Sequence, residues 1–180
     1  VTYLRGVGSG LYGFMTEQFV DEMALAGGHD PLDFRFTLSR DIPDWKPILT
    51  VLKEQSGFST DLPRGEGMGV AITEEHSVIG AMAATVTVSR RGQLRVEKIV
   101  SVVDSGHMVN PLTCIEQMEG GIALELSHTL NGAIEFRGGH RKTQNGSSTA
   151  RVIRSRKLLA LLPAPSLTAT RADSKPLISR

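Results

Sequence analysis

The sequence predicts an α+β fold, in which helices pack on a β-hairpin or small antiparallel sheet and a disordered tail follows. Three observations lead to this prediction. Apolar residues recur at helical spacing before about residue 57, and the pattern then changes to the two-residue alternation of strands between Val78 and Val103. After Phe136 neither period continues, and the segment 137–180 alternates basic, Ser/Thr and small residues.

The first predicted helix covers residues 14–26 and ends at the glycine pair that follows. Its predicted core side consists of Met15, Phe19, Met23, Val20 and Ala26. Its predicted solvent side consists of Glu17, Asp21 and Glu22. The spacing of the Met/Phe stripe is typical of core packing.

Two shorter helices follow the first one. Asp30–Pro31 combines an N-cap with a proline at the first helical position and predicts a helix to about Ser39. Asp44–Ser56 predicts another helix, with Gly57 as its stop signal. Residues 59–69 carry one proline and three glycines and are predicted to form a flexible loop.

The strand pattern predicts an antiparallel hairpin from residues 78–89 and 94–103, joined by a turn at residues 90–93. The run Ile99–Val103 is apolar at nearly every position, which indicates either a bulge or burial on both faces.

A long helix is predicted over residues 112–130, opened by the N-cap pair Asn110–Pro111. The pair Gly120–Gly121 lies in its interior, where each glycine costs about 1 kcal/mol relative to alanine. Such a pair needs a packing or ligand reason, or else the helix breaks there. Residues 133–136 fit one more short strand.

Charge divides the chain at the same place as the pattern. The formal net charge is +1 over 180 residues. Residues 1–136 hold 10 basic and 18 acidic residues, a net charge of −8, whereas residues 137–180 hold 10 basic residues and one acid, a net charge of +9. Such asymmetry is typical of a basic tail on a globular body, and disorder is the default interpretation of the tail. A nucleic-acid-binding arm is the alternative, although the tail has no aromatic residue for base stacking.

Several protein classes are excluded. The single cysteine, Cys114, cannot form an internal disulfide, and no apolar run reaches the ~20 residues of a membrane-spanning helix. The first residues do not resemble a signal peptide, and both the cytoplasm and the periplasm stay open as the compartment. The absence of an initial Met indicates a fragment or a processed product. The histidines and Cys114 do not show zinc- or iron-site spacing.

Two segments carry residue types suited to binding. Arg5 and Gly6 open a glycine-rich stretch before the first helix, where a guanidinium and exposed backbone N–H groups suit an anionic group. Gln117 and the pair Gly120–Gly121 follow one another within about one turn of the long helix, where an amide and accessible backbone suit a flat heterocycle.

Five motifs in order resemble the molybdenum-binding subunit of the xanthine dehydrogenase/aldehyde oxidase family, and most closely the branch that contains the isoquinoline 1-oxidoreductase beta subunit. The motifs are Arg-Gly-Val-Gly (5–8), Phe-Val-Asp-Glu-Met-Ala (19–24), Asp-Pro-Leu-Asp-Phe-Arg (30–35), Val-Val-Asp-Ser-Gly-His-Met-Val-Asn-Pro (102–111) and Gln-Met-Glu-Gly-Gly-Ile-Ala (117–123). The resemblance covers residues 4–136. It implies that residues 1–136 are part of a molybdopterin-binding domain.

The resemblance also implies a cofactor site, a reaction and a partner. Arg5 and Gly6 would line the molybdenum cofactor (molybdopterin), Gln117 would contact the pterin, and Gly120 and Gly121 would allow its close approach. Members of the family hydroxylate N-heterocycles or aldehydes with a glutamate as general base, and pass electrons to a 2Fe–2S subunit.

The sequence departs from the family at three places. The Gly-Gln-Gly cofactor loop and the Gly-x-Gly-Glu segment that carries the general base are absent, so no catalytic residue is assigned and the isolated chain is predicted to be inactive. Beyond Phe136 the family's acidic, proline-rich continuation is replaced by the basic tail, which indicates a shifted reading frame. The alternative to the enzyme is an interaction protein with an acidic body and a basic nucleic-acid-binding tail.

Overall fold

The computed structural model describes residues 5–6, 8–131, 136–141 and 168–169. These residues belong to two compact units, Val1–His107 with Pro165–Arg180, and Met108–Ala164. The first unit holds a sheet with three helices, and the second holds one long helix and a short hairpin. The tail predicted to be disordered, residues 137–180, lies outside the described residues, apart from residues that belong to three short strands and the turn between two of them.

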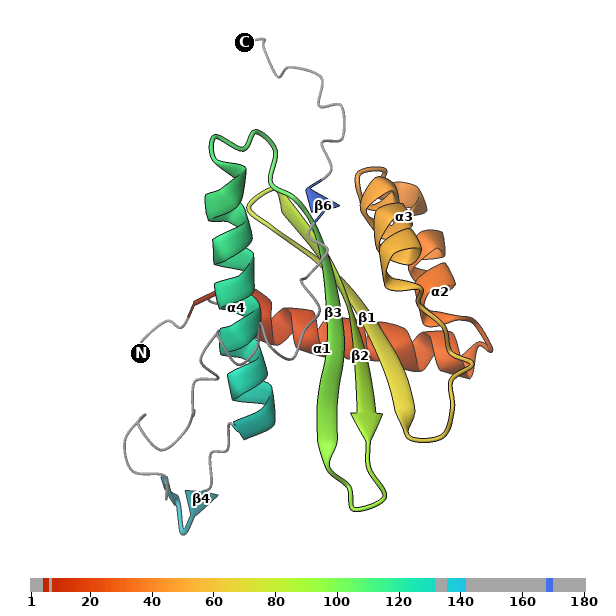
Figure 1. Cartoon of the computed structure of the whole chain (residues 1–180), viewed down its shortest axis with the longest axis vertical. Coiled ribbons are helices and arrows are strands. Elements are labelled where there is room, and N and C mark those ends of the chain that lie inside the picture. The colour runs from red at the N-terminus through yellow and green to blue at the C-terminus, as the bar shows by residue number, and fades with distance from the viewer. Residues whose placement is uncertain (1–4, 7, 132–135, 142–167, 170–180) are drawn as a thin grey trace. The chain divides into compact units, whose positions relative to one another are not determined.

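The first unit begins with helices and continues with a sheet (Figure 1). The helices are α1 (Ser9–Ala26), α2 (Pro31–Leu38) and α3 (Trp45–Ser56), with a 3-10 turn, η1 (Ser39–Asp41), between the last two. The strands β1 (Glu66–Glu75), β2 (Val78–Val88) and β3 (Leu94–Asp104) form an antiparallel meander, and β6 (Thr168–Ala169) pairs in parallel with β3.

The core of this unit forms where α3 covers one face of the sheet. Two rows of paired residues cross the three strands on that face, Val70–Ala83–Val100 and Ile72–Ala81–Val102. The alanines of the central strand leave room for the helix, whose buried side chains are Ile48, Leu49 and Leu52. Leu32 of α2 completes the same cluster.

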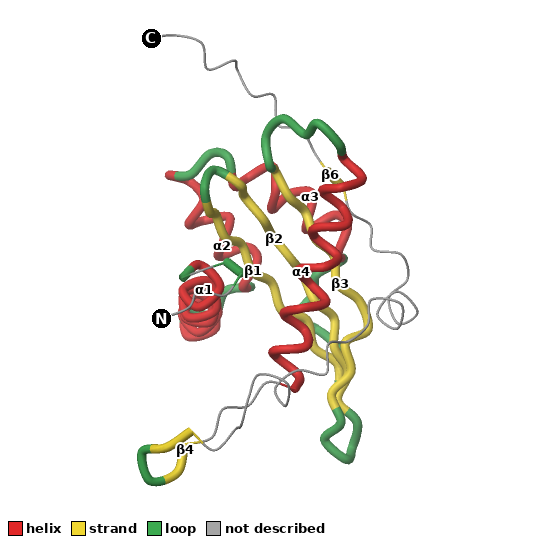
Figure 2. Tube along the Cα trace, turned by 90° about the vertical axis from the view of Figure 1, so that its left-hand side faces the viewer, coloured by secondary structure: helices red, strands yellow, loops and turns green. Residues whose placement is uncertain are grey.

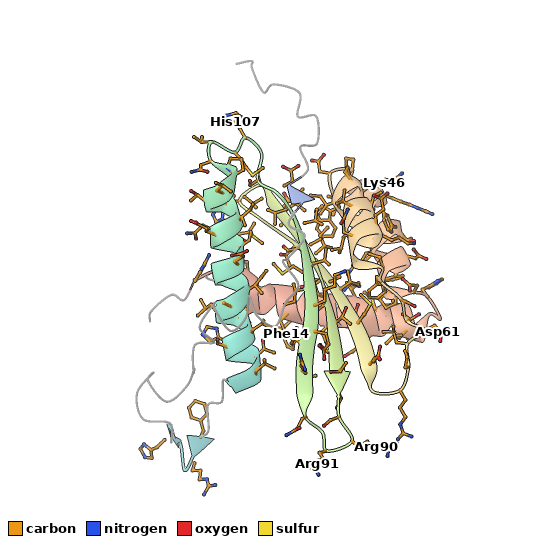
Figure 3. All side chains as sticks on the ribbon, viewed as in Figure 1. Phe14, Lys46, Asp61, Arg90, Arg91 and His107 are labelled. Atoms are coloured by element: carbon orange, nitrogen blue, oxygen red, sulfur yellow. The ribbon has the colours of Figure 1, made fainter. Side chains whose placement is uncertain are left out.

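The predicted boundaries of α2, α3 and the β2–β3 hairpin are confirmed to within a few residues. Asp30 caps α2 through its Oδ1, and Gly57 ends α3 with a left-handed backbone at φ 64°. Ile99–Val102 are buried on both faces, and a bulge at Glu97 shifts the β2–β3 register. Arg90 and Arg91 lie at the tip of this hairpin (Figure 3).

The prediction of a flexible loop over residues 59–69 is wrong from Glu66 onward, because β1 begins there. Its glycines concealed the strand, since glycine disfavours strands and Gly67 and Gly69 interrupt one side of the alternation. These glycines pair with Val86 and Ala84 of β2, so the cross-strand partners supply the side chains on that face. The fold therefore contains a three-stranded meander rather than one hairpin.

The predicted orientation of the first helix is wrong for most of its residues, although Val20 is buried and Glu22 is exposed as predicted. The helix begins at Ser9, and its buried residues are Glu17, Val20 and Ala24. Met15 and Phe19, predicted for the core, have 58% and 59% of their surface exposed. The reason is tertiary: Glu17 is held inward by hydrogen bonds to the rest of the unit.

The second unit contains α4 (Pro111–Asn131) and a hairpin of β4 (Phe136–Arg137) with β5 (His140–Arg141). The predicted long helix is confirmed, and it continues through Gly120–Gly121 without a break. Of the strand predicted at residues 133–136, only Phe136 is described, and it belongs to β4.

Candidate functional site

The first predicted cofactor segment, Arg5–Gly6, forms an exposed turn directly before α1. Gly6 has φ +85°, a left-handed backbone that suits glycine. Its carbonyl oxygen accepts a hydrogen bond from the backbone N–H of Ser9 (3.0 Å) and another from the Ser9 hydroxyl. Two hydrogen bonds therefore join Gly6 to Ser9, the first residue of α1, and Arg5 directly precedes this turn.

Two of the family-like motifs meet in space at Arg35. Its side chain, 1% exposed, donates from Nε to Glu17 Oε2 (2.9 Å) and from Nη1 to Asp21 Oδ1 (2.6 Å). Glu17 Oε2 also accepts from the backbone N–H of Ile72 (2.8 Å) on β1. Because β1 is an edge strand, this bond attaches α1 to the sheet, and Figure 2 shows α1 end-on beside β1.

The spacing of Glu17 and Asp21 contained a signal for this contact that the sequence analysis missed. The two acids are four residues apart and so lie on one side of a helix, where a single guanidinium can reach both. Gly13, on the same side, shows how closely helix and strand approach: a Cβ there would lie 3.0 Å from Thr73 Cγ2.

The second predicted segment lies on α4. Gln117, Gly120 and Gly121 are three and four residues apart and therefore share one side of the helix. Gln117 and Gly120 are exposed, and a Cβ at Gly120 would have no atom within 4 Å. No close packing contact therefore explains the glycine at position 120. The helix backbone there is accessible to a ligand.

The loop before α4 is shaped by two side-chain-to-backbone hydrogen bonds. Asp104 Oδ1 accepts from the N–H of Gly106 (2.9 Å), whose φ is +69°. Asn110 Oδ1 accepts from the N–H of Leu112 (3.1 Å), as expected of the predicted N-cap. Each half of the Asp–Asn motif therefore fixes one end of the connection from β3 to α4.

Neither a metal cluster nor a membrane helix is present in the described part of the chain. Among the described residues, no three His, Cys, Asp or Glu side chains gather as a metal ion would need. No helix among them is both long and apolar enough to cross a bilayer.

Residues 50–155 match the family model of the molybdopterin cofactor-binding domain. The chain belongs to this family. The match begins in α3, includes strands β1 to β3 and α4, and continues beyond Phe136. The domain boundary at that residue stays a prediction.

Two relatives support the same assignment. The chain is 31% identical over 134 residues to the beta subunit of isoquinoline 1-oxidoreductase from Brevundimonas diminuta, a match that covers 72% of this chain and 17% of that protein. It is 28% identical over 154 residues to the B subunit of nicotinate dehydrogenase from Pseudomonas putida, a match that covers 75% of this chain and 13% of that protein. The chain thus spans less than a fifth of the length of either relative. The predicted family is therefore confirmed, and molybdopterin is confirmed as the cofactor of that family.

The residues of α4 fit such a cofactor. A pterin presents a flat, polar ring system that requires hydrogen-bond partners and close access to backbone. Gln117 supplies a side-chain amide with both donor and acceptor atoms, and Gly120 supplies an open approach on the same side of the helix.

Proposed function

We propose that this chain supplies part of the molybdopterin-binding cage of a molybdenum hydroxylase that acts on N-heterocycles. The observation that carries the proposal is the exposed Gln117–Gly120 side of α4 within the matched domain. The names of both relatives favour N-heterocycles over aldehydes, because isoquinoline and nicotinate are both nitrogen-containing aromatic rings.

The roles of the individual residues follow from their chemistry. Gln117 would hold the pterin by hydrogen bonds from its amide, and Gly120 and Gly121 would let the ring approach the helix backbone. Arg5 would place a positive charge near an anionic part of the cofactor, with Gly6 giving the turn that positions it. When bound, the cofactor supplies the metal-assisted oxygen transfer and accepts the two electrons of the reaction.

We also propose that other polypeptides complete the enzyme. Both relatives carry the word subunit in their names, so each works beside at least one other polypeptide. A partner carrying 2Fe–2S clusters would receive the electrons. No residue of these 180 is assigned as general base, and we therefore expect no turnover from the chain by itself. Residues 1–136 would form the cofactor-binding part and residues 137–180 a separate tail.

Cofactor content tests the proposal. The native protein is purified from cells after substitution of Gln117→Ala or Gly120→Val in its gene, and bound molybdenum and pterin are measured per mole of protein. Both variants are expected to lose most of the bound cofactor, because one removes a hydrogen-bonding group and the other fills the approach. Glu116→Ala, an exposed neighbour on another side of α4, is the matched control. Unchanged molybdenum content in both test variants would contradict the proposed site.

Turnover tests the second part. The purified 180-residue chain is incubated with isoquinoline or nicotinate, molybdenum cofactor and a dye acceptor. Dye reduction is expected to stay at the level of the cofactor alone. A substrate-dependent rate above that background would show that the chain contains its own catalytic base.

A further inference from the structure

The side of α1 that faces away from the sheet carries several large apolar side chains, and the exposed polar pair Gln18 and Glu22 lies beside them. Its exposed large side chains, here called the outer face of α1, are Leu11, Tyr12, Met15, Phe19 and Met23. Their spacing of three and four residues places them together, opposite the buried Glu17, Val20 and Ala24. Phe14, labelled on the same helix in Figure 3, is 69% exposed and lies at the margin of this face.

The helix cannot rotate to bury the outer face within its own unit. Glu17 is held inward by Arg35 (2.9 Å) and by the N–H of Ile72 (2.8 Å), and rotation would break both bonds. Rotation would also turn a carboxylate away from a buried guanidinium, a strongly unfavourable change. The outer face therefore stays uncovered by the rest of the first unit.

Two properties of the helix indicate what kind of cover it needs. Large exposed apolar patches on proteins mark contact surfaces, and five large apolar side chains of α1 lie on one side of it. Helices that bind lipid surfaces are rich in Lys and Arg, whereas the only charged residues of α1 are Glu17, Asp21 and Glu22. These features favour an apolar protein surface over a membrane.

We propose that the outer face of α1 is an internal contact of a molybdopterin-binding subunit, and that its occupant is the part of that subunit outside these 180 residues. This inference rests on the proposed function. The relatives are several times longer than the chain, whose matches cover 17% and 13% of their lengths, so a single polypeptide of that kind has ample chain to cover α1.

Methionine oxidation measures the cover directly, because hydrogen peroxide converts an accessible thioether to its sulfoxide. The native protein purified from cells and the isolated 180-residue chain are treated alike, and each methionine is followed by peptide mass spectrometry. Met15 and Met23 are expected to oxidise several-fold more slowly in the native protein. Met68 and Met82, half-buried in the sheet, are the internal controls and should oxidise equally in both samples.

Two results would overturn the proposal. Equal oxidation of Met15 in both samples would mean that nothing outside these 180 residues covers the face. Protection that appears in the isolated chain as its concentration is raised would assign the face to a second copy instead. The molybdenum content of the native sample separates the two proposals: bound molybdenum with an unprotected Met15 refutes the contact and leaves the function intact.

A variant provides an independent test. Phe19→Lys is expected to leave the unfolding midpoint of the isolated chain unchanged, since the side chain is 59% exposed, and to restore rapid oxidation of Met15 in the native protein. Val88→Lys, a 45% exposed position at the end of β2, is the matched control and should alter neither. Continued protection of Met15 in the Phe19→Lys protein would contradict the contact.

Discussion

Removal of the Arg35 guanidinium should destabilise the chain more than loss of an ordinary polar contact. The side chain is 1% exposed and donates four hydrogen bonds, to Glu17 Oε2 (2.9 Å), Asp21 Oδ1 (2.6 Å), Pro31 O (3.0 Å) and Glu17 O (3.2 Å). In Arg35→Met the Glu17 carboxylate, itself 10% exposed, would keep only the Ile72 N–H as a donor among these contacts. Leaving a buried charge without its partner costs about 3–5 kcal/mol.

Urea denaturation measures this cost, with the fluorescence of Trp45 as the signal because it is the only tryptophan and packs against the core. For a slope of about 2 kcal/mol/M, a loss of about 3–5 kcal/mol lowers the midpoint by about 1.5–2.5 M. Lys53→Met is the control: its ion pair with Asp33 (2.7 Å) is solvent-exposed on both sides, so its loss should cost less than about 1 kcal/mol.

A double variant checks the physical reason. Adding Glu17→Gln to Arg35→Met removes the unpaired charge while the amide oxygen can still accept from the Ile72 N–H, so the double variant should be more stable than Arg35→Met. The reasoning would be refuted by an Arg35→Met chain within about 1 kcal/mol of wild type, or by a double variant whose losses simply add.

Four further substitutions have definite expected effects on the free energy of unfolding, measured by the same denaturation. Asp30→Ala removes the side-chain cap of α2 and should cost about 1 kcal/mol; an unchanged midpoint would contradict the cap. Ser77→Gly should stabilise by about 1 kcal/mol, because His76 and Ser77 both have positive φ in the β1–β2 turn; destabilisation would show that the serine side chain matters more than the backbone. Leu52→Ala should cost about 2–5 kcal/mol, since Leu52 is fully buried against the sheet, and a loss below about 1 kcal/mol would contradict that core. Ser101→Ala should be neutral or stabilising, because the buried Ser101 hydroxyl has no hydrogen-bond partner within the described structure; a clear loss of stability would reveal one.

Local signals predicted α2, α3 and the β2–β3 hairpin well. Asp30–Pro31 and Gly57 act through their own backbone and nearest neighbours, so their effect can be read without the fold. The same is true of Asn110, which caps α4 as predicted. β1 escaped prediction because Gly67 and Gly69 have no intrinsic preference for a strand and adopt one only through their pairing with β2.

The candidate site was predictable in part. The order of the motifs identified the molybdopterin-binding family, which the family model and the relatives confirm. The placement of Gln117 and Gly120 on one side of α4 follows from helical spacing alone. Their roles toward the cofactor, and those of Arg5 and Gly6, remain predictions that the proposed measurements address.

By itself, the sequence determined the α+β class, most element boundaries and the family, since all three depend on residue order and local backbone preference. Tertiary structure decided which side of α1 turns inward. Periodicity shows only that two sides of a helix differ, and the apolar side was the natural choice for the core. The buried Arg35 and the backbone N–H of Ile72, which has no partner strand at the edge of β1, both need an acceptor. Glu17 Oε2 accepts a hydrogen bond from each of them. Glu17 is 18 positions from Arg35 and 55 positions from Ile72 in the sequence. These contacts therefore exist only once the chain has folded.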